Sequence, residues 1–145
     1  TWTQYKFPIA VTAVSLVACN LPVHDESMLN ASSYMNTGIA AGMNGDLRDS
    51  IDYLLSAIDA EPGLAEAYAN LGRAYEQSNE PAKAIRCYQQ ALLVNPMLQP
   101  VDTWIGSLLE SMGSRSEAIE SYRRALEKNP LDEAAQRGME RLRRE

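Results

Sequence analysis

An all-α solenoid, built from three consecutive pairs of helices and a final capping helix, is the fold class that the sequence predicts. The first observation behind it is a period of 34 residues, which relates the glycines, turn residues and prolines of three copies: Gly38, Gly72 and Gly106; Gly45, Asn79 and Gly113; Pro62, Pro96 and Pro130. The second is the spacing of apolar residues at three and four positions within each copy, which is typical of amphipathic helices. A helical pair repeated at this period is the pattern of a helical solenoid.

The first copy is predicted to hold one helix that ends near Asn44 and a second helix at 47–60. Asn30, Ser32 and Ser33 are candidate caps for the start of the first helix, because their side chains accept hydrogen bonds from free backbone amides. A proline two residues after the second helix prevents that helix from continuing.

The second and third copies follow the same plan, and a last helix covers the end of the array. Their helices are predicted at 64–77, 81–95, 101–112, 116–128 and 131–145. In the last helix Ala135, Met139 and Leu142 share one face. We expect this face to cover the apolar surface that the third copy leaves open, since no copy buries its apolar stripe alone.

The second helix of each copy carries a stripe of large residues that faces its own partner helix and the next copy. The stripes consist of Ile51, Leu54 and Ile58, then Ile85, Tyr88 and Leu92, then Ile119, Tyr122 and Leu126. The repeated glycines of the first helices are expected where paired helices cross. Each costs about 1 kcal/mol of helix propensity, so close packing at the crossing must return more than that.

These residues resemble the tetratricopeptide repeat (TPR), whose pattern has a large residue, Leu-Gly and Tyr in the first helix and Ala, an aromatic, Ala and Pro in the second. The middle copy matches at Tyr68, Leu71, Gly72, Tyr75, Ala84, Tyr88, Ala91 and Pro96; the first at Tyr34, Gly38, Ser50, Leu54, Ala57 and Pro62; the third at Ile105, Gly106, Leu109, Ala118, Tyr122, Ala125 and Pro130. The third copy departs at Asp102, where a large residue belongs. The resemblance implies a right-handed α-solenoid with units at 31–64, 65–98 and 99–130 and a capping helix at 131–145.

The resemblance also implies that the protein binds a segment of another protein, because TPR families line a concave face with the first helix of each unit. The residues at these positions here are Met35, Asn36, Ile39, Met43, Asn70, Arg73, Gln77, Trp104, Ser107 and Glu110. We expect a groove for an extended or helical segment with large apolar residues, in which Trp104 is an anchor and Arg73 a polar guide. The alternative is that Met35, Ile39 and Trp104 pack as core against neighbouring helices or the N-terminal segment.

One activity of this family is not expected here. Its chaperone-tail binders clamp a C-terminal carboxylate with lysines, arginines and asparagines. Only Asn70 matches that clamp, and the other clamp positions hold Met35, Ile39, Pro100 and Trp104.

The composition argues against several other functions. A net charge of −6 without a basic stripe disfavours a nucleic-acid partner. The single histidine, His24, stands alone, so no metal site is expected. No nucleophile set or phosphate-binding loop is found, and we expect neither an enzyme nor a cofactor nor a small-molecule substrate. Cys87 is predicted to be a small, half-buried residue of a helix instead of a reactive thiol.

Residues 1–18 contain a short apolar run, which is typical of a secretory signal peptide or a hydrophobic anchor. The end of the run, LVAC at 16–19, resembles the bacterial lipobox, in which the cysteine, here Cys19, carries a diacylglycerol and the preceding peptide is removed. Residues 19–30 would then be a polar tether. The alternative is that 1–18 stay on the chain, as an uncleaved anchor or as a helix docked in a larger membrane complex.

The sequence thus predicts a membrane-tethered TPR adaptor, a lipoprotein scaffold that holds a protein partner for assembly or delivery in the bacterial cell envelope. Lys6 before the apolar run and acidic residues after it place the repeats on the periplasmic side, with the choice between inner and outer membrane left open. The alternative function is a permanent structural subunit of a membrane or extracellular complex that retains its N-terminal segment.

Overall fold

The computed structural model describes residues 26–144, and the predicted signal or anchor at 1–18, Cys19 and His24 lie outside this range. Seven α-helices and no strands make up the described residues, which confirms the all-α prediction. The helices are α1 (Glu26–Asn44), α2 (Leu47–Ala60), α3 (Ala65–Gln77), α4 (Pro81–Val94), α5 (Val101–Ser111), α6 (Arg115–Lys128) and α7 (Glu133–Arg144).

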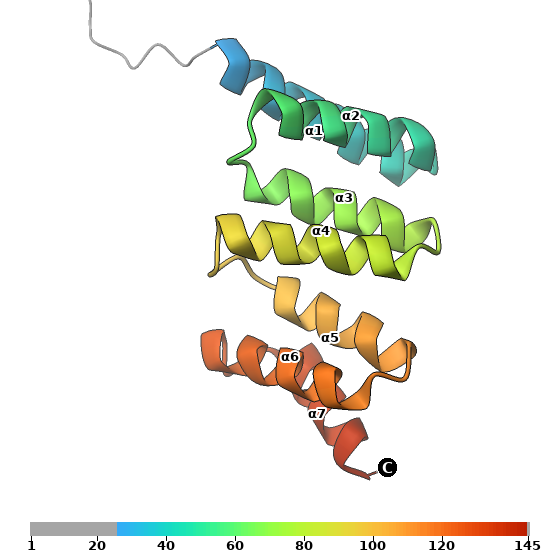
Figure 1. Ribbon diagram of the computed structural model, residues 1–145, viewed down its shortest axis with the longest axis vertical. Helices are drawn as coiled ribbons and strands as arrows, with labels where there is room; N and C mark the ends of the chain where they lie inside the picture. Colours follow the sequence, from blue (N-terminus) through green and yellow to red (C-terminus); the bar gives the residue numbers. More distant parts are fainter. Residues whose placement is uncertain (1–25, 145) are drawn as a thin grey trace, which may run out of the picture.

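The helices follow one another along a single stack, with the first and last described residues at its opposite ends (Figure 1). Each helix packs most extensively against the other helix of its pair, and successive pairs meet through α2 and α3 and through α4 and α5. A stack in which each pair contacts only its neighbours is a helical solenoid, as the repeat predicts.

The start of α1 differs from the sequence prediction. The helix begins at Glu26, so Asn30, Ser32 and Ser33 lie inside it and do not cap it. Residues 26–30 belong to this helix instead of the predicted polar tether. No proline or glycine interrupts 26–37, and nothing in that stretch therefore stops the helix from extending toward the N-terminus.

The turns inside the three pairs share one backbone feature. Gly45, Asn79 and Gly113 have φ angles of 90°, 58° and 77°. This left-handed region disfavours most side chains but suits glycine and is tolerated by asparagine. The repeated turn residues therefore reflect a backbone requirement that recurs in each pair.

The glycines of the first helices permit close crossing, as predicted. A Cβ atom built on Gly72 would lie 2.5 Å from Tyr88 Cε1, and one on Gly106 would lie 2.8 Å from Tyr122 Cδ1. The two tyrosine rings are 0% and 1% exposed. Each ring thus packs on bare helix backbone, and the buried apolar area offsets the poor helix propensity of glycine.

The third unit has, in place of the missing large residue, a buried carboxylate that pairs with two basic residues. Asp102 is 2% exposed, accepts a hydrogen bond of 3.1 Å from Arg124 Nε and forms an ion pair with Lys128. Both basic residues lie on α6, so the carboxylate joins the two helices of its pair. The departure at Asp102 leaves the register unchanged, because Gly106 still meets Tyr122 as Gly72 meets Tyr88.

The last helix, α7, closes the end of the stack. Asp132 caps it by accepting hydrogen bonds from the backbone amides of Ala134 and Ala135, both at 3.0 Å. Ala135 and Leu142 are buried, and Met139 packs against the same core as Tyr122. The apolar face predicted for this helix thus covers the third unit.

Candidate protein-binding groove

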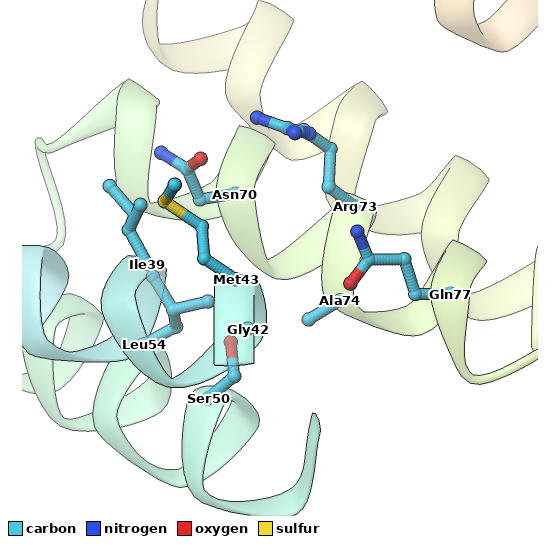
Figure 2. A pocket seen from close by; sticks show the side chains of 9 residues that line it. All are labelled: Ile39, Gly42, Met43, Ser50, Leu54, Asn70, Arg73, Ala74 and Gln77. Carbon is cyan, nitrogen blue, oxygen red and sulfur yellow. The ribbon is translucent and has the colours of Figure 1, made fainter. Parts of the chain in front are cut away.

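A hollow of about 180 Å³ opens between α1 and α3, with α2 as its floor (Figure 2). We call this hollow the first-unit pocket. Its lining comes from Ile39, Gly42 and Met43 of α1, Ser50 and Leu54 of α2, and Asn70, Arg73, Ala74 and Gln77 of α3.

The first-unit pocket lacks a hydrogen-bonded pair of side chains that is present in the other two units. In the second unit Tyr88 donates a hydrogen bond of 2.9 Å to Glu76. In the third unit Tyr122 donates one of 2.7 Å to Glu110. The positions 34 residues before Tyr88 and Glu76 hold Leu54 and Gly42. Leu54 is shorter than a tyrosine and Gly42 has no side chain. The space that a phenol and a carboxylate take in the other two units is therefore open in the first.

The first-unit pocket has an apolar interior and a polar rim. Leu54 and Ala74 are 1% and 3% exposed and form apolar floor and wall. Asn70, Arg73 and Gln77 lie along α3 at the rim, and Asn70 Nδ2 donates a hydrogen bond of 2.8 Å to the Glu66 carbonyl. Such an arrangement suits a ligand with an apolar group between polar ones.

A second, wider hollow of about 480 Å³ adjoins the first and is lined by Arg73, Glu76, Gln77, Tyr88 and Trp104. The Trp104 ring lies 5.4 Å from the Tyr88 ring between centroids, and the Arg73 guanidinium lies 5.8 Å from the Trp104 centroid. Arg73 and Gln77 of α3 line both hollows, so the two adjoin each other along α3, and we call them together the α3 groove.

The structure brings six of the ten predicted partner-binding residues to the α3 groove: Ile39, Met43, Asn70, Arg73, Gln77 and Trp104. Trp104 is partly buried and packs against the core, so it satisfies part of the alternative expectation as well. Met35 packs against the small core around Leu54 and lines neither hollow, as the core alternative expects. Asn36 and Ser107 are exposed and also lie outside both hollows.

Glu110 is engaged with the capping helix and does not line the groove. Arg141 of α7 donates two hydrogen bonds of 2.9 Å to its carboxylate, and Tyr122 donates a third. The Arg141 guanidinium lowers the pKa of the Glu110 carboxyl. Burial, and then the hydrogen bond to Glu110, raise the pKa of Tyr122 to about 12. Glu110 thus lies outside the α3 groove, because its side chain is held by α6 and α7.

Four residues of the first-unit pocket were missed by the sequence reasoning: Gly42, Ser50, Leu54 and Ala74. The prediction covers only the first helix of each unit, and Ser50 and Leu54 lie on the second helix, α2. A signal was present at Leu54 and Gly42, because both depart from the residues found 34 and 68 positions later.

The described residues offer little for other chemistry. No three potential metal-binding side chains gather anywhere in 26–144. Burial raises the pKa of the half-buried Cys87 thiol, which lowers its reactivity at neutral pH. None of the helices α1–α7 has the length and apolar character needed to cross a membrane.

Comparison with known proteins identifies the repeat. Residues 65–98 and 103–130 match family models of the tetratricopeptide repeat. Residues 65–98 and 103–130 are therefore tetratricopeptide repeats. The TPR units explain the shared contact between a helix glycine and a tyrosine in the second and third pairs. No curated protein matches the chain.

Solved structures with the same fold include other TPR domains. The Arabidopsis OM64 TPR domain superposes with a TM-score of 0.77 at 22% identity, over 81% of this chain and 98% of that one. The first TPR of Spaghetti (RPAP3), bound to the HSP90 peptide SRMEEVD, gives 0.77 at 20% identity, over 81% and 93%. A crystal structure of MamA gives 0.69 at 32% identity, over 72% of this chain and 60% of MamA. These similarities establish a TPR fold.

Proposed function

We propose that the protein is an adaptor that binds a segment of a partner protein in the α3 groove. The observation that carries the proposal is a pair of adjoining hollows that combine an apolar pocket with a charged guanidinium. Within residues 26–144, Arg73 forms no ion pair and instead lies over the Trp104 ring. A positive charge held at an open groove favours a ligand that brings a carboxylate. The RPAP3 domain, with the same fold, holds a peptide.

The ligand proposed here differs from the chaperone tail held by RPAP3. The positions that resemble a carboxylate clamp hold Met35, Ile39, Pro100 and Trp104, and only Asn70 fits. None of the four has a side chain that can donate to a terminal carboxylate except the indole of Trp104. An internal segment with apolar side chains suits this groove better than a charged C-terminus.

We further propose that the adaptor is tethered to a membrane in the bacterial cell envelope, with its repeats on the periplasmic side. The support is the apolar run before Cys19 and the lipobox-like LVAC at 16–19. A diacylglycerol on Cys19 supplies two acyl chains, which is enough for stable anchoring. The alternative is a permanent subunit of a membrane or extracellular complex, for which residues 1–18 remain on the chain.

Cross-linking in the native cell, followed by mass spectrometry, tests the adaptor function. We expect partner peptides cross-linked near α3, their loss in Arg73→Glu, and their retention in Arg86→Glu. Arg86 is an exposed arginine of α4 that lines neither hollow, so its reversal controls for the change in net charge. Partner peptides unchanged in Arg73→Glu would remove the groove from the proposal.

The intact mass of the native protein tests the tether. A chain that starts at Cys19 and carries diacylglycerol supports the lipoprotein. A chain that retains residues 1–18 without modification contradicts lipidation and favours the permanent subunit. Cys19→Ser blocks the thioether, so the lipoprotein predicts release of this variant from the membrane fraction.

A further inference from the structure

We infer that the first-unit pocket receives one bulky apolar side chain of an extended partner segment, and that Arg73 pairs with an aspartate or glutamate about two residues away on that segment. This inference rests on the proposed function and names the chemistry of its ligand. The apolar interior of the pocket comes from Leu54 and Gly42, which stand where the other two units have tyrosine and glutamate.

The size of the pocket sets the size of the group that enters it. An apolar cavity of about 150 Å³ accommodates one benzene molecule. The first-unit pocket, at about 180 Å³, therefore fits a single phenylalanine, leucine or methionine side chain. The corresponding positions in the next unit hold Tyr88 and Glu76, so a guest side chain would take the place of their phenol and carboxylate.

The pocket is held open by its own walls. Leu54 packs against Gly38, where a Cβ would lie 2.8 Å from Leu54 Cγ, and so it stays on the far side of the hollow. Gly42 has no side chain to extend into the space. Met43 is 84% exposed and stands at the mouth (Figure 2), where its flexible thioether adapts to an incoming group.

The positive charge of Arg73 at the rim favours a particular residue type next to the apolar side chain of the partner segment. Arg73 lies between the pocket and the Trp104 ring, which holds its guanidinium in place without neutralising it. Arginine binds carboxylates through two parallel hydrogen bonds, which are stronger than bonds between neutral groups. An acidic residue beside the apolar one is thus favoured, and a basic residue there is repelled.

The amides on either side of Arg73 favour an extended ligand. Asn70, Arg73 and Gln77 are spaced three and four residues apart and form one row along α3. Asparagine and glutamine side chains both donate and accept hydrogen bonds. They can therefore pair with the free N–H and C=O groups of an extended partner segment. A helical segment has already used its backbone groups. On an extended chain, alternate residues share a face and lie about 7 Å apart, which sets the spacing of the acidic residue.

A displayed library of random ten-residue peptides, selected on the full chain, tests this inference. We expect enriched peptides to share one phenylalanine, leucine or methionine with an acidic residue about two positions away. In synthetic peptides, alanine at the apolar position lowers affinity about tenfold or more, as expected for losing one buried apolar side chain. Lysine at the acidic position lowers it about fivefold or more.

The matched variant is Gly42→Glu with Leu54→Tyr, which restores the pair found in the other units and fills the pocket. It should melt no lower than the wild type, because Gly38 accepts the ring as Gly72 and Gly106 do. It should bind the selected peptides about tenfold or more weakly. Arg73→Glu is a surface change and should prefer the lysine peptide over the acidic one, while Arg86→Glu should bind as the wild type does.

The outcomes distinguish a failure of this inference from a failure of the proposed binding of a partner segment. Enriched peptides without the apolar and acidic pair, or binding unaffected by the filled pocket, overturn the inference and leave segment binding intact. Failure of Arg73→Glu to invert the charge preference overturns the role of Arg73. No enrichment by the wild-type chain overturns segment binding itself.

Discussion

The first and third helix pairs differ at the same two repeat positions, which hold Gly42 and Leu54 in the first pair and Glu110 and Tyr122 in the third. In the third, Tyr122 is 1% exposed, packs between the backbones of Gly106 and Gly138, and hydrogen-bonds Glu110, to which α7 adds Arg141. In the first, the corresponding positions leave a hollow beside Leu54. A repeat position that stabilises one unit thus lines an open hollow in another, where we propose that a ligand binds, and the neighbouring units supply the stability.

The distribution of the core agrees with this difference. Tyr88 and Tyr122 belong to one large apolar cluster that runs from α3 to α7, whereas Leu54 belongs to a small cluster shared with α3 and α4. Local stability in a helical array follows the interfaces of each unit. We therefore expect the first unit to open before the third, and four predictions test the contrast.

The largest effect is expected for Tyr122→Ala, which should lower the free energy of unfolding by about 3–5 kcal/mol, because a fully buried ring and its hydrogen bond are lost. Leu54→Ala should cost about 2 kcal/mol, the low end of the range for buried leucines, since a hollow already lies beside it. Urea denaturation measures both. An equal or larger cost for Leu54→Ala would contradict the contrast between the units.

The second prediction concerns the charge network that replaces an apolar residue in the third unit. Lys128→Ala should cost about 1–3 kcal/mol, because it leaves the buried Asp102 carboxylate with Arg124 alone. Asp102→Leu should cost about 1 kcal/mol or less, since it removes the buried charge and restores a large apolar residue. Thermal denaturation of both variants gives the order, and the reverse order would show that the ion pair itself stabilises the unit.

The third prediction compares two helix glycines. Gly72→Ala should destabilise by about 1–3 kcal/mol, because its Cβ would lie 2.5 Å from a buried tyrosine ring. Gly42→Ala should be neutral or stabilise by up to about 1 kcal/mol, since its Cβ meets only the small Ser50 side chain, with the hydroxyl at 3.0 Å, and alanine has the higher helix propensity. Opposite signs in urea denaturation support the pocket, whereas equal losses would indicate that the hollow is packed in solution.

The smallest effect is expected for Glu110→Gln, about 0.5 kcal/mol at neutral pH, because Arg141 is mostly exposed and screened by solvent. Arg141 lowers the pKa of Glu110 in the folded state. The ion pair therefore contributes stability above the unfolded pKa of about 4.3 and loses it as pH falls through the lower, folded value. Urea midpoints from pH 7 to pH 3 should converge for wild type and variant at the acid end. A constant difference across this range would exclude the ion pair as its cause.

Most of the fold was predictable from the sequence because its signals are local. The proline after each pair, the positive-φ turn residue and the apolar stripe all act within a few residues of their own helix. The start of α1 was not predictable from capping residues, since Asn30 and Ser32 stand in the helix interior and no proline or glycine lies between them and Glu26. Residues of the groove were predictable where they lie on first helices, as Asn70, Arg73 and Gln77 do.

The sequence by itself determined the period, the pairing of helices and the glycines at their crossings, because each depends on spacing along one chain. Only the tertiary structure showed that Asp102 is neutralised by α6, that Glu110 contacts α7, and that the space beside Leu54 stays open. These facts depend on which side chains from distant helices meet. The absence of a side chain at Gly42 leaves a pocket only because packing between the helices holds the surrounding walls in place.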